Sequence, residues 1–176
     1  QLAGYDVYYE EKSPQTRQRF IKNLRKACDW AEEAQVVLAI EIMDDPFINS
    51  IEKYLAVEKE IDSPYLFVYP DIGNVSAWHN DVYSEFYLGH HAIAALHLKD
   101  TYAVTESSKG QFRDVTFGQG CVKWEEAFDI LKQTNYNGPF LIEMWSENCE
   151  TVEETRAAIQ EAQAFLYPLI KKAGLM

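Results

Sequence analysis

The sequence lacks several features that would point directly to a class of function. None of its apolar runs approaches the roughly 20 residues that a membrane-spanning helix needs. Its three cysteines have no C-x-x-C spacing and are odd in number, so a disulfide framework is not indicated and a reducing cytoplasm is the default location. Basic residues are scarce: 16 Lys and Arg against 28 Asp and Glu give a net charge of -12. This balance argues against nucleic acid and anionic membranes as partners, because both attract a basic surface.

Several catalytic and nucleotide-binding motifs are also missing. No G-x-G-x-x-G follows an expected strand, and the Walker A, G-x-S-x-G and H-E-x-x-H patterns are absent. These absences weigh against a nucleotide-binding open sheet, a Ser-His-Asp hydrolase and a zinc peptidase. An anionic small molecule remains possible as a ligand, because a local cluster of cations or a metal ion can override the global charge.

The composition is that of a globular domain with a real core. The chain has 176 residues, of which 47% are hydrophobic and 14% aromatic. Disordered segments have few aromatic and few other apolar residues, so disorder is excluded. One domain over residues 1–176 is the expected organisation.

Hydrophobic periodicity predicts alternating strands and helices. Apolar side chains at three- and four-residue spacing, together with capping residues, predict helices at 14–34, from 50 to about 62, 81–88, 124–134 and 151–174. Short runs of β-branched and aromatic residues predict strands at 36–42, 65–70, 93–98 and 139–144. Residues 71–74 are expected to form a loop, and 99–122 is the longest irregular stretch. Strand–helix units of this length form a parallel sheet with right-handed crossovers.

Two closures of such a sheet compete: an open, doubly wound sheet and a (β/α)8 barrel. A complete barrel needs roughly 250 residues, so this chain would supply only its second half. The opening residues 1–9 look like the tail of a strand that runs into a loop, and we expect something to be missing in front of Gln1.

Four apolar runs each end in a side chain that can bind a metal ion. A charged residue at the end of a buried strand is costly unless it is paired or coordinated. Three carboxylates and one imidazole in this position therefore suggest one oxygen/nitrogen metal site at one edge of the sheet. The alternatives are strand-end glutamates paired with lysines, an aspartate in an Asx-turn and a hydrogen-bonded core histidine. The runs and their final residues are 36–40 with Glu41, 66–70 with Asp71, 93–96 with His97 and 140–142 with Glu143.

Other polar residues follow the same strand ends. Lys99 comes two residues after His97, and Arg113 lies in the long loop, where its forked guanidinium would suit a phosphate or carboxylate or would pair with Asp114. Gly118-Gln119-Gly120 would allow close approach of the backbone to a ligand, or would form a turn. Tyr5 and Trp145 are candidate walls for a sugar or core aromatics, and the remaining histidines are expected at the surface: His79, His90 and His91.

Five segments together resemble one family, the L-ribulose-5-phosphate 3-epimerases. These are also called L-xylulose-5-phosphate 3-epimerases of the ascorbate-utilisation type, and they belong to the xylose-isomerase-like barrel superfamily. The resemblance covers essentially the whole chain, and its most specific part runs from His97 to Gly120. The segments are Ala39-Ile40-Glu41, 69–74 (YPDIGN), 96–101 (LHLKDT), 112–120 (FRDVTFGQG) and 140–145 (FLIEMW).

The resemblance implies a (β/α)8 barrel that holds one divalent ion, either Mn, Zn, Mg or Co. Its ligands would be Glu41, Asp71, His97 and Glu143. Glu41 and Glu143 would also be the acid/base pair that inverts C3 of a ketopentose 5-phosphate (L-xylulose 5-phosphate or L-ribulose 5-phosphate) through a cis-enediolate.

The resemblance also implies contacts to the substrate and its phosphate from Lys99, Arg113 and Asn74. A hexulose epimerase of the same superfamily would usually carry a His at position 74 and an Arg shortly after the metal-binding His. The sequence has Asn74 and Lys99-Asp100-Thr101 there, which disfavours a free ketohexose as the substrate.

The overall expectation is an α/β protein: the C-terminal half of a (β/α)8 TIM barrel with parallel strands and outer helices, lacking the first strands. Half a barrel exposes sheet edges. We therefore expect it to be weakly active or inactive alone, and stable only as a homo-oligomer or in association with the missing N-terminal half. The expected partner is a small-molecule sugar phosphate. Alternatives are another isomerase on the same scaffold, an endonuclease-type phosphodiesterase, which the acidic charge disfavours, and an inactive half-barrel.

Overall fold

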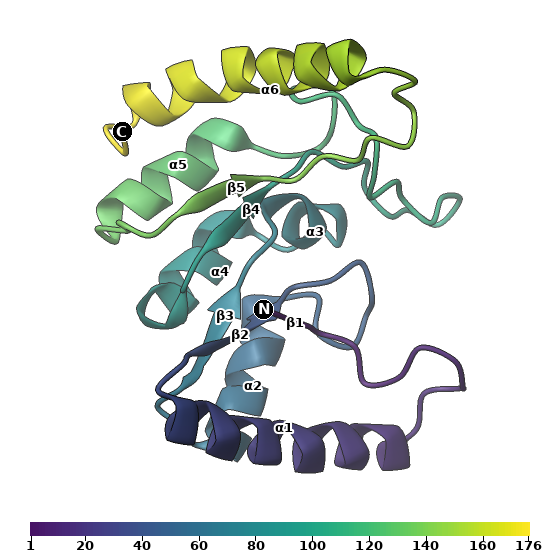
Figure 1. Cartoon of the computed structure of the whole chain (residues 1–176), viewed down its shortest axis with the longest axis vertical. Helices are drawn as coiled ribbons and strands as arrows, with labels where there is room; N and C mark the ends of the chain where they lie inside the picture. The colour runs from purple at the N-terminus through teal and green to yellow at the C-terminus, as the bar shows by residue number, and fades with distance from the viewer.

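Parallel strands alternate with helices along the chain in the computed structural model, which describes residues 1–176 (Figure 1). The strands run through the middle of the molecule, between α1 and α6. In order, the elements are β1 (Leu2–Ala3), α1 (Pro14–Ala34), β2 (Leu38–Glu41), α2 (Ile51–Ile61), β3 (Leu66–Tyr69), α3 (Ile72–Ala77), α4 (Val82–Gly89), the 3-10 helix η1 (His90–Ala92), β4 (Leu96–Leu98), α5 (Trp124–Gln133), β5 (Phe140–Ile142) and α6 (Val152–Lys172).

All strand pairs are parallel. β1, β2 and β3 form one sheet in that order, and β4 pairs with β5 in a second. Two isolated parallel bridges, Val68 with Ile93 and Asp71 with His97, join the two sheets into one wall. This arrangement confirms the predicted α/β class with parallel strands and outer helices, and it is part of a barrel wall.

The helices begin where capping residues predict. The side chain of Ser13 accepts a hydrogen bond from the backbone of Thr16, and Pro14 occupies the first turn of α1. Thr151 and Glu154 form the predicted capping box of α6. Ser50, where the predicted helix begins, caps α2. These local signals mark the starts of α1, α2 and α6.

Two features differ from the sequence-based expectation. Residues 71–74, predicted as a loop, contain the N-cap and first turn of α3, because the Asp71 carboxylate accepts the backbone N–H of Asn74 at 2.8 Å. The strands are also shorter than predicted. β2 starts only at Leu38, opposite Leu66, and the preceding Val36 and Val37 are more than half exposed.

The hydrophobic core lies between the strand wall and the helices. Ile40, Val68, Leu96 and Leu98 come from three neighbouring strands and are fully buried. They pack in one cluster of 27 buried residues with side chains from the helices. β5 is less covered, since its central residue Leu141 is 51% exposed.

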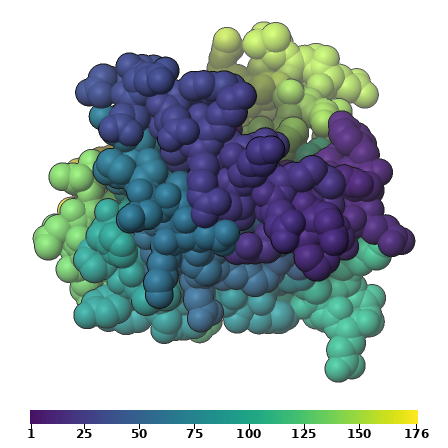
Figure 2. Space-filling model, turned by 90° about the horizontal axis from the view of Figure 1, so that it is seen from below, coloured from purple at the N-terminus to yellow at the C-terminus, as the bar shows by residue number.

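Two loops extend from the same side of the molecule as seen in Figure 1: the segment before α1 and the segment after β4. In the view from below, the purple N-terminal segment lies above a teal-green protrusion whose colour corresponds to residues just after 100 (Figure 2). A short antiparallel bridge between Thr105 and Ser108 closes that protrusion. These loops lie beside the polar site described next.

Candidate metal centre

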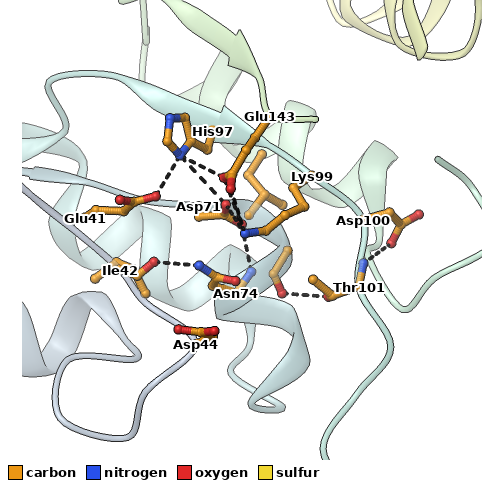
Figure 3. Close-up of polar contacts among 12 residues, drawn as sticks. Glu41, Ile42, Asp44, Asp71, Asn74, His97, Lys99, Asp100, Thr101 and Glu143 are labelled. Atoms are coloured by element: carbon orange, nitrogen blue, oxygen red, sulfur yellow. Dashed lines mark hydrogen bonds and ion pairs between the residues drawn. The ribbon is translucent and has the colours of Figure 1, made fainter. Parts of the chain in front are cut away.

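The four strand-end residues of the sequence analysis meet at one point (Figure 3). One ligand atom from each of the four lies within 4.8 Å of the others. Glu41 ends β2, Asp71 follows β3, His97 lies in β4 and Glu143 follows β5. Residues more than 100 positions apart thus share one pocket, because the carboxyl ends of parallel strands meet at one edge of a sheet.

Alternation along the strand explains how His97 reaches this site. Its neighbours Leu96 and Leu98 are fully buried in the core, so the imidazole projects to the opposite face. The Tyr69 ring packs edge-on against it, with the ring centroids 4.5 Å apart. Tyr69 is a neighbour of the site that sequence reasoning missed, since it is one more aromatic residue in an apolar strand.

The imidazole is the centre of the cluster. Its Nδ1 lies 2.8 Å from Glu41 Oε1, 3.1 Å from Glu143 Oε2 and 3.8 Å from Asp71 Oδ2. Burial alone would lower the pKa of His97, but the hydrogen bonds to Glu143 and Glu41 outweigh it and raise this pKa to about 9.

Lys99 adds a cation to the same group. Its Nζ lies 3.0 Å from Asp71 Oδ2 and 3.3 Å from both carboxylate oxygens of Glu143. The side chain is 9% exposed, so the charge is held inside the site. The alternative in which a strand-end glutamate pairs with a lysine is therefore also present, as Glu143 with Lys99. It occurs within the same cluster as the four possible metal ligands.

The carboxylates of Asp71 and Glu143 have different environments. Asp71 is fully buried, and this burial raises its pKa despite the nearby Lys99. Burial also acts to raise the pKa of Glu143, but hydrogen bonds from His97 and Asp71 overcome it and lower the pKa. The two carboxyls therefore differ in pKa although they belong to one cluster.

The residues present fit a divalent cation. Three carboxylates and one imidazole form an oxygen/nitrogen set of a kind that accepts Mn, Mg, Zn or Co, and an entering ion displaces the protons that such ligands carry. Asp71 Oδ2 is buried within the cluster, 3.0 Å from Lys99 Nζ and 3.8 Å from His97 Nδ1, and a carboxylate oxygen has a second lone pair available to an ion. Buried carboxylates of this kind are stabilised by coordination.

The predicted substrate-contacting residues surround the same cavity, which has a volume of about 420 Å³. Asn74 is buried, with its Nδ2 donating to Ile42 O at 2.9 Å and its Oδ1 without a partner. Arg113 is exposed, and its guanidinium lies 3.9 Å above the centre of the Trp145 ring. Among the residues lining the cavity are Tyr5, Glu41, Asn74, His97, Lys99, Arg113, Glu143 and Trp145.

The remaining histidines lie at the surface, as predicted. His79, His90 and His91 are all exposed, and none of them belongs to the four-residue cluster. Asp100 has no predicted role in the site from the sequence analysis. In the structure this residue is 1% exposed, and its carboxylate accepts several hydrogen bonds from the long loop.

A wall of parallel strands, outer helices and a cluster of carboxylates and imidazole at the strand ends define part of an α/β barrel with a candidate metal site. The chain belongs to the xylose isomerase-like TIM barrel family, whose model matches residues 1–169.

Relatives whose sequences align with the whole chain carry epimerase names. The chain is 51% identical over 176 residues to "Putative L-ribulose-5-phosphate 3-epimerase SgbU" of Haemophilus influenzae and 46% identical to "L-ribulose-5-phosphate 3-epimerase UlaE" of Escherichia coli O157:H7. The whole chain is covered in both alignments, but it spans only 60% and 59% of these relatives.

Solved structures show the same fold at low sequence identity. An L-ribulose 3-epimerase structure matches with a TM-score of 0.74 and 18% identity, covering 95% of this chain and 58% of that one. A xylose isomerase-like TIM barrel protein from Mycobacterium smegmatis, in complex with magnesium, matches with a TM-score of 0.67 and 19% identity, covering 97% and 55%. None of the helices in the chain has the length and apolar character required to cross a membrane.

Proposed function

We propose that this chain carries the metal and proton-transfer site of a 3-epimerase that acts on a ketopentose 5-phosphate. The observation that carries the proposal is the placement of Glu41 and Glu143 on either side of one imidazole nitrogen, with Asp71 in the same cluster. The relatives named L-ribulose-5-phosphate 3-epimerase support L-ribulose 5-phosphate and L-xylulose 5-phosphate as the substrate pair.

Glu41, Asp71, His97 and Glu143 are the residues that would hold a divalent metal ion. Bound there, Mn, Zn, Mg or Co would supply a Lewis acid that acidifies the proton next to the substrate carbonyl and stabilises negative charge on its oxygen. The magnesium complex of the related barrel protein from Mycobacterium smegmatis agrees with a cation in a barrel of this family.

The two glutamates exchange protons with opposite faces of the substrate. One carboxylate takes the C3 proton, the C–H electron pair forms a C2–C3 double bond, and the carbonyl electrons move to O2. The other glutamate, starting as the acid, then gives its proton to the opposite face of C3 as the carbonyl reforms. One C–H bond breaks and one forms, so the product differs from the substrate only in configuration at C3.

Asn74, Lys99 and Arg113 are proposed to bind and orient the sugar phosphate. Arg113 is exposed at the cavity and pairs with no carboxylate, and it offers a planar fork of donors that suits a phosphate. The Asn74 Oδ1 without a partner is available to a substrate hydroxyl. The charge of -12 keeps nucleic acid and anionic membranes disfavoured as partners.

The test compares Glu41→Gln and Glu143→Gln in deuterated water. Each variant should lose turnover by at least about a hundredfold, and exchange at C3 should be lost for the epimer whose proton the removed glutamate takes, as expected for removal of a general acid/base. Metal content is measured in parallel, and Glu126→Gln, which alters an exposed residue of α5, is the matched control. Exchange at the normal rate in both glutamine variants would refute the proposal. Absence of turnover in the unmodified protein would favour an inactive half-barrel.

Association is proposed as a condition for activity. Leu141 on β5 and Trp145 beyond it are exposed by 51% and 37%, a poor environment for large apolar side chains. A homo-oligomer, or a complementary N-terminal half-barrel, would cover them. Sedimentation with a parallel assay tests this: a fully active monomer would contradict it. A cytoplasmic location, suggested by the cysteine pattern, stays a prediction.

A further inference from the structure

The loop after β4 is closed by a buried carboxylate at its own beginning. Asp100 is 1% exposed, and its two oxygens accept five hydrogen bonds. The donors are the backbone N–H groups of Thr101 (2.9 Å), Gly118 (2.8 Å), Gly120 (3.2 Å) and Val122 (3.3 Å) and the indole Nε1 of Trp124 (3.3 Å). Three of these backbone donors lie 18 to 22 residues further along the chain.

From this geometry we infer that Asp100 is a positioning residue that holds Arg113 in place for the phosphate of the substrate. The inference rests on the proposed function, because it assigns Asp100 a part in substrate binding at the same site. Asp100 is not among the residues that line the cavity of about 420 Å³, and its hydrogen-bond donors are loop backbone groups and the Trp124 indole. It acts through the loop.

Two anchors leave Arg113 little freedom. The backbone groups of Tyr102 and Gln111 exchange hydrogen bonds at 2.9 and 3.0 Å, which fixes the loop on one side of Arg113. Asp100 fixes it on the other side from Gly118 onwards. The span between the two anchors is short, so movement at Gly118 is transmitted to Arg113. Within the span, Gln111 Nε2 also donates to Arg113 O at 2.8 Å.

The glycines of the loop are required by this arrangement. A Cβ at Gly120 would collide with Asp100 Oδ1 and Thr101 O. Gly118 has φ +85° and lies against the Phe165 ring. The loop therefore closes on the carboxylate with no room for side chains, which explains why Gly118-Gln119-Gly120 stands out in the sequence.

The charge of Asp100 is also neutralised where it lies. Five donors aimed at one carboxylate offset its negative charge, as in other backbone anion sites. The Arg113 guanidinium rests on the Trp145 ring instead of pairing with this carboxylate. Arg113 thus keeps its positive charge for a ligand.

The first test uses trypsin on the native protein and needs no activity. Lys109 and Arg113 are exposed cleavage sites in the loop. Asp100→Asn keeps the size of the side chain but turns an amide N–H₂ toward N–H donors. It should raise the rate of cleavage at these two sites roughly tenfold, the effect of losing one charge-assisted hydrogen bond. Glu106→Gln, in the exposed tip of the same loop, is the control and should leave the rate unchanged.

Inorganic phosphate is the probe for the link to Arg113. In the unmodified protein, phosphate should slow cleavage after Arg113, and in Asp100→Asn this protection should be lost at the same concentration. Trp124→Phe removes a single donor while keeping an aromatic core residue, so it should show the same pattern more weakly if Asp100→Asn fails to fold. Equal protection by phosphate in all variants would overturn the inference.

Kinetics separate positioning from a general loss of structure. Asp100→Asn should raise KM for the ketopentose 5-phosphate about tenfold while kcat and the metal content change less than about twofold. The value of kcat/KM for the unphosphorylated ketopentose should stay unchanged. In an Arg113→Ala background, Asp100→Asn should have little further effect, because both changes remove the same interaction. Additive losses would overturn the inference.

The two proposals fail in different ways. If the unmodified protein shows no epimerisation even in its associated form, but phosphate protects Arg113 only when Asp100 is present, the proposed function is wrong and the role of Asp100 is upheld. If epimerisation is normal and Asp100→Asn changes neither cleavage nor KM, the role of Asp100 is wrong and the proposed function is upheld.

Discussion

The ammonium group of Lys99 lies 3.3 Å from each carboxylate oxygen of Glu143, inside the group of residues that would bind a metal ion. The same ammonium lies 3.0 Å from Asp71 Oδ2. A lysine in this place stabilises the cluster of acids in the absence of metal. It also adds a positive charge that an entering dication must face.

This relationship predicts opposite effects of Lys99→Met on stability and on metal binding. Without metal, the variant should lose about 3 kcal/mol of unfolding free energy, because buried carboxylates lose their cation. With metal, the loss should be smaller, since the ion then meets no competing charge. Urea denaturation with and without Mn²⁺ measures both, and Lys123→Met, which removes an exposed pair, is the control. A variant that binds Mn²⁺ more weakly than the unmodified protein would contradict this prediction.

Glu85 of α4 stabilises the start of α2. Its Oε2 accepts the backbone N–H groups of Ile51 at 2.5 Å and Glu52 at 3.0 Å, so a side chain of α4 caps α2. Glu85→Gln should lower the unfolding free energy by about 1 kcal/mol, because a charge-assisted cap becomes a neutral one. Thermal denaturation measures the change. Glu125→Gln, whose carboxylate pairs with Lys172 in solvent, should have a much smaller effect.

Asp6 should contribute stability that depends on pH. Burial tends to raise its pKa, but hydrogen bonds from Lys12 and Thr16 outweigh burial and lower the pKa. Because the folded-state pKa lies below the unfolded value of about 3.9, the contribution is complete above that pH and is lost as the pH falls through the folded-state pKa. Asp6→Asn should therefore be less stable than the unmodified protein at pH 7 by up to about 1 kcal/mol.

The difference in unfolding free energy between the unmodified protein and Asp6→Asn should shrink as the pH falls below about 4. Urea midpoints at pH 7, 5 and 3 measure it. A gap of constant size over this range would show that Asp6 acts through packing and not through its charge.

The sequence predicts much of the fold and the site for identifiable reasons. Helix starts follow local capping signals, as at Ser13 and Thr151, which need no tertiary context. The convergence of Glu41 and Glu143 follows from one rule about the carboxyl ends of parallel strands. Both features depend only on which residues stand beside one another and at strand ends, and these can be read from the sequence.

Features that depend on contacts between distant residues are not predicted in the same way. The start of α3 resembles a loop in the sequence because Asp71 serves as an N-cap and as part of the metal-type cluster, and its sequence signal fits a turn equally well. The role of Asp100 depends on donors from Gly118 to Trp124, which no spacing rule brings together. The length of β2 depends on where β3 lies beside it.

The most direct test of the account is the metal content of the purified protein and of Asp71→Asn. The unmodified protein should bind one divalent ion per chain, measured by elemental analysis and by titration with Mn²⁺. Asp71→Asn should lose at least about tenfold in affinity, because it removes one buried anionic ligand. A protein that binds no divalent ion, or an Asp71→Asn variant that binds it as tightly, would contradict the convergence of these four residues on one cation.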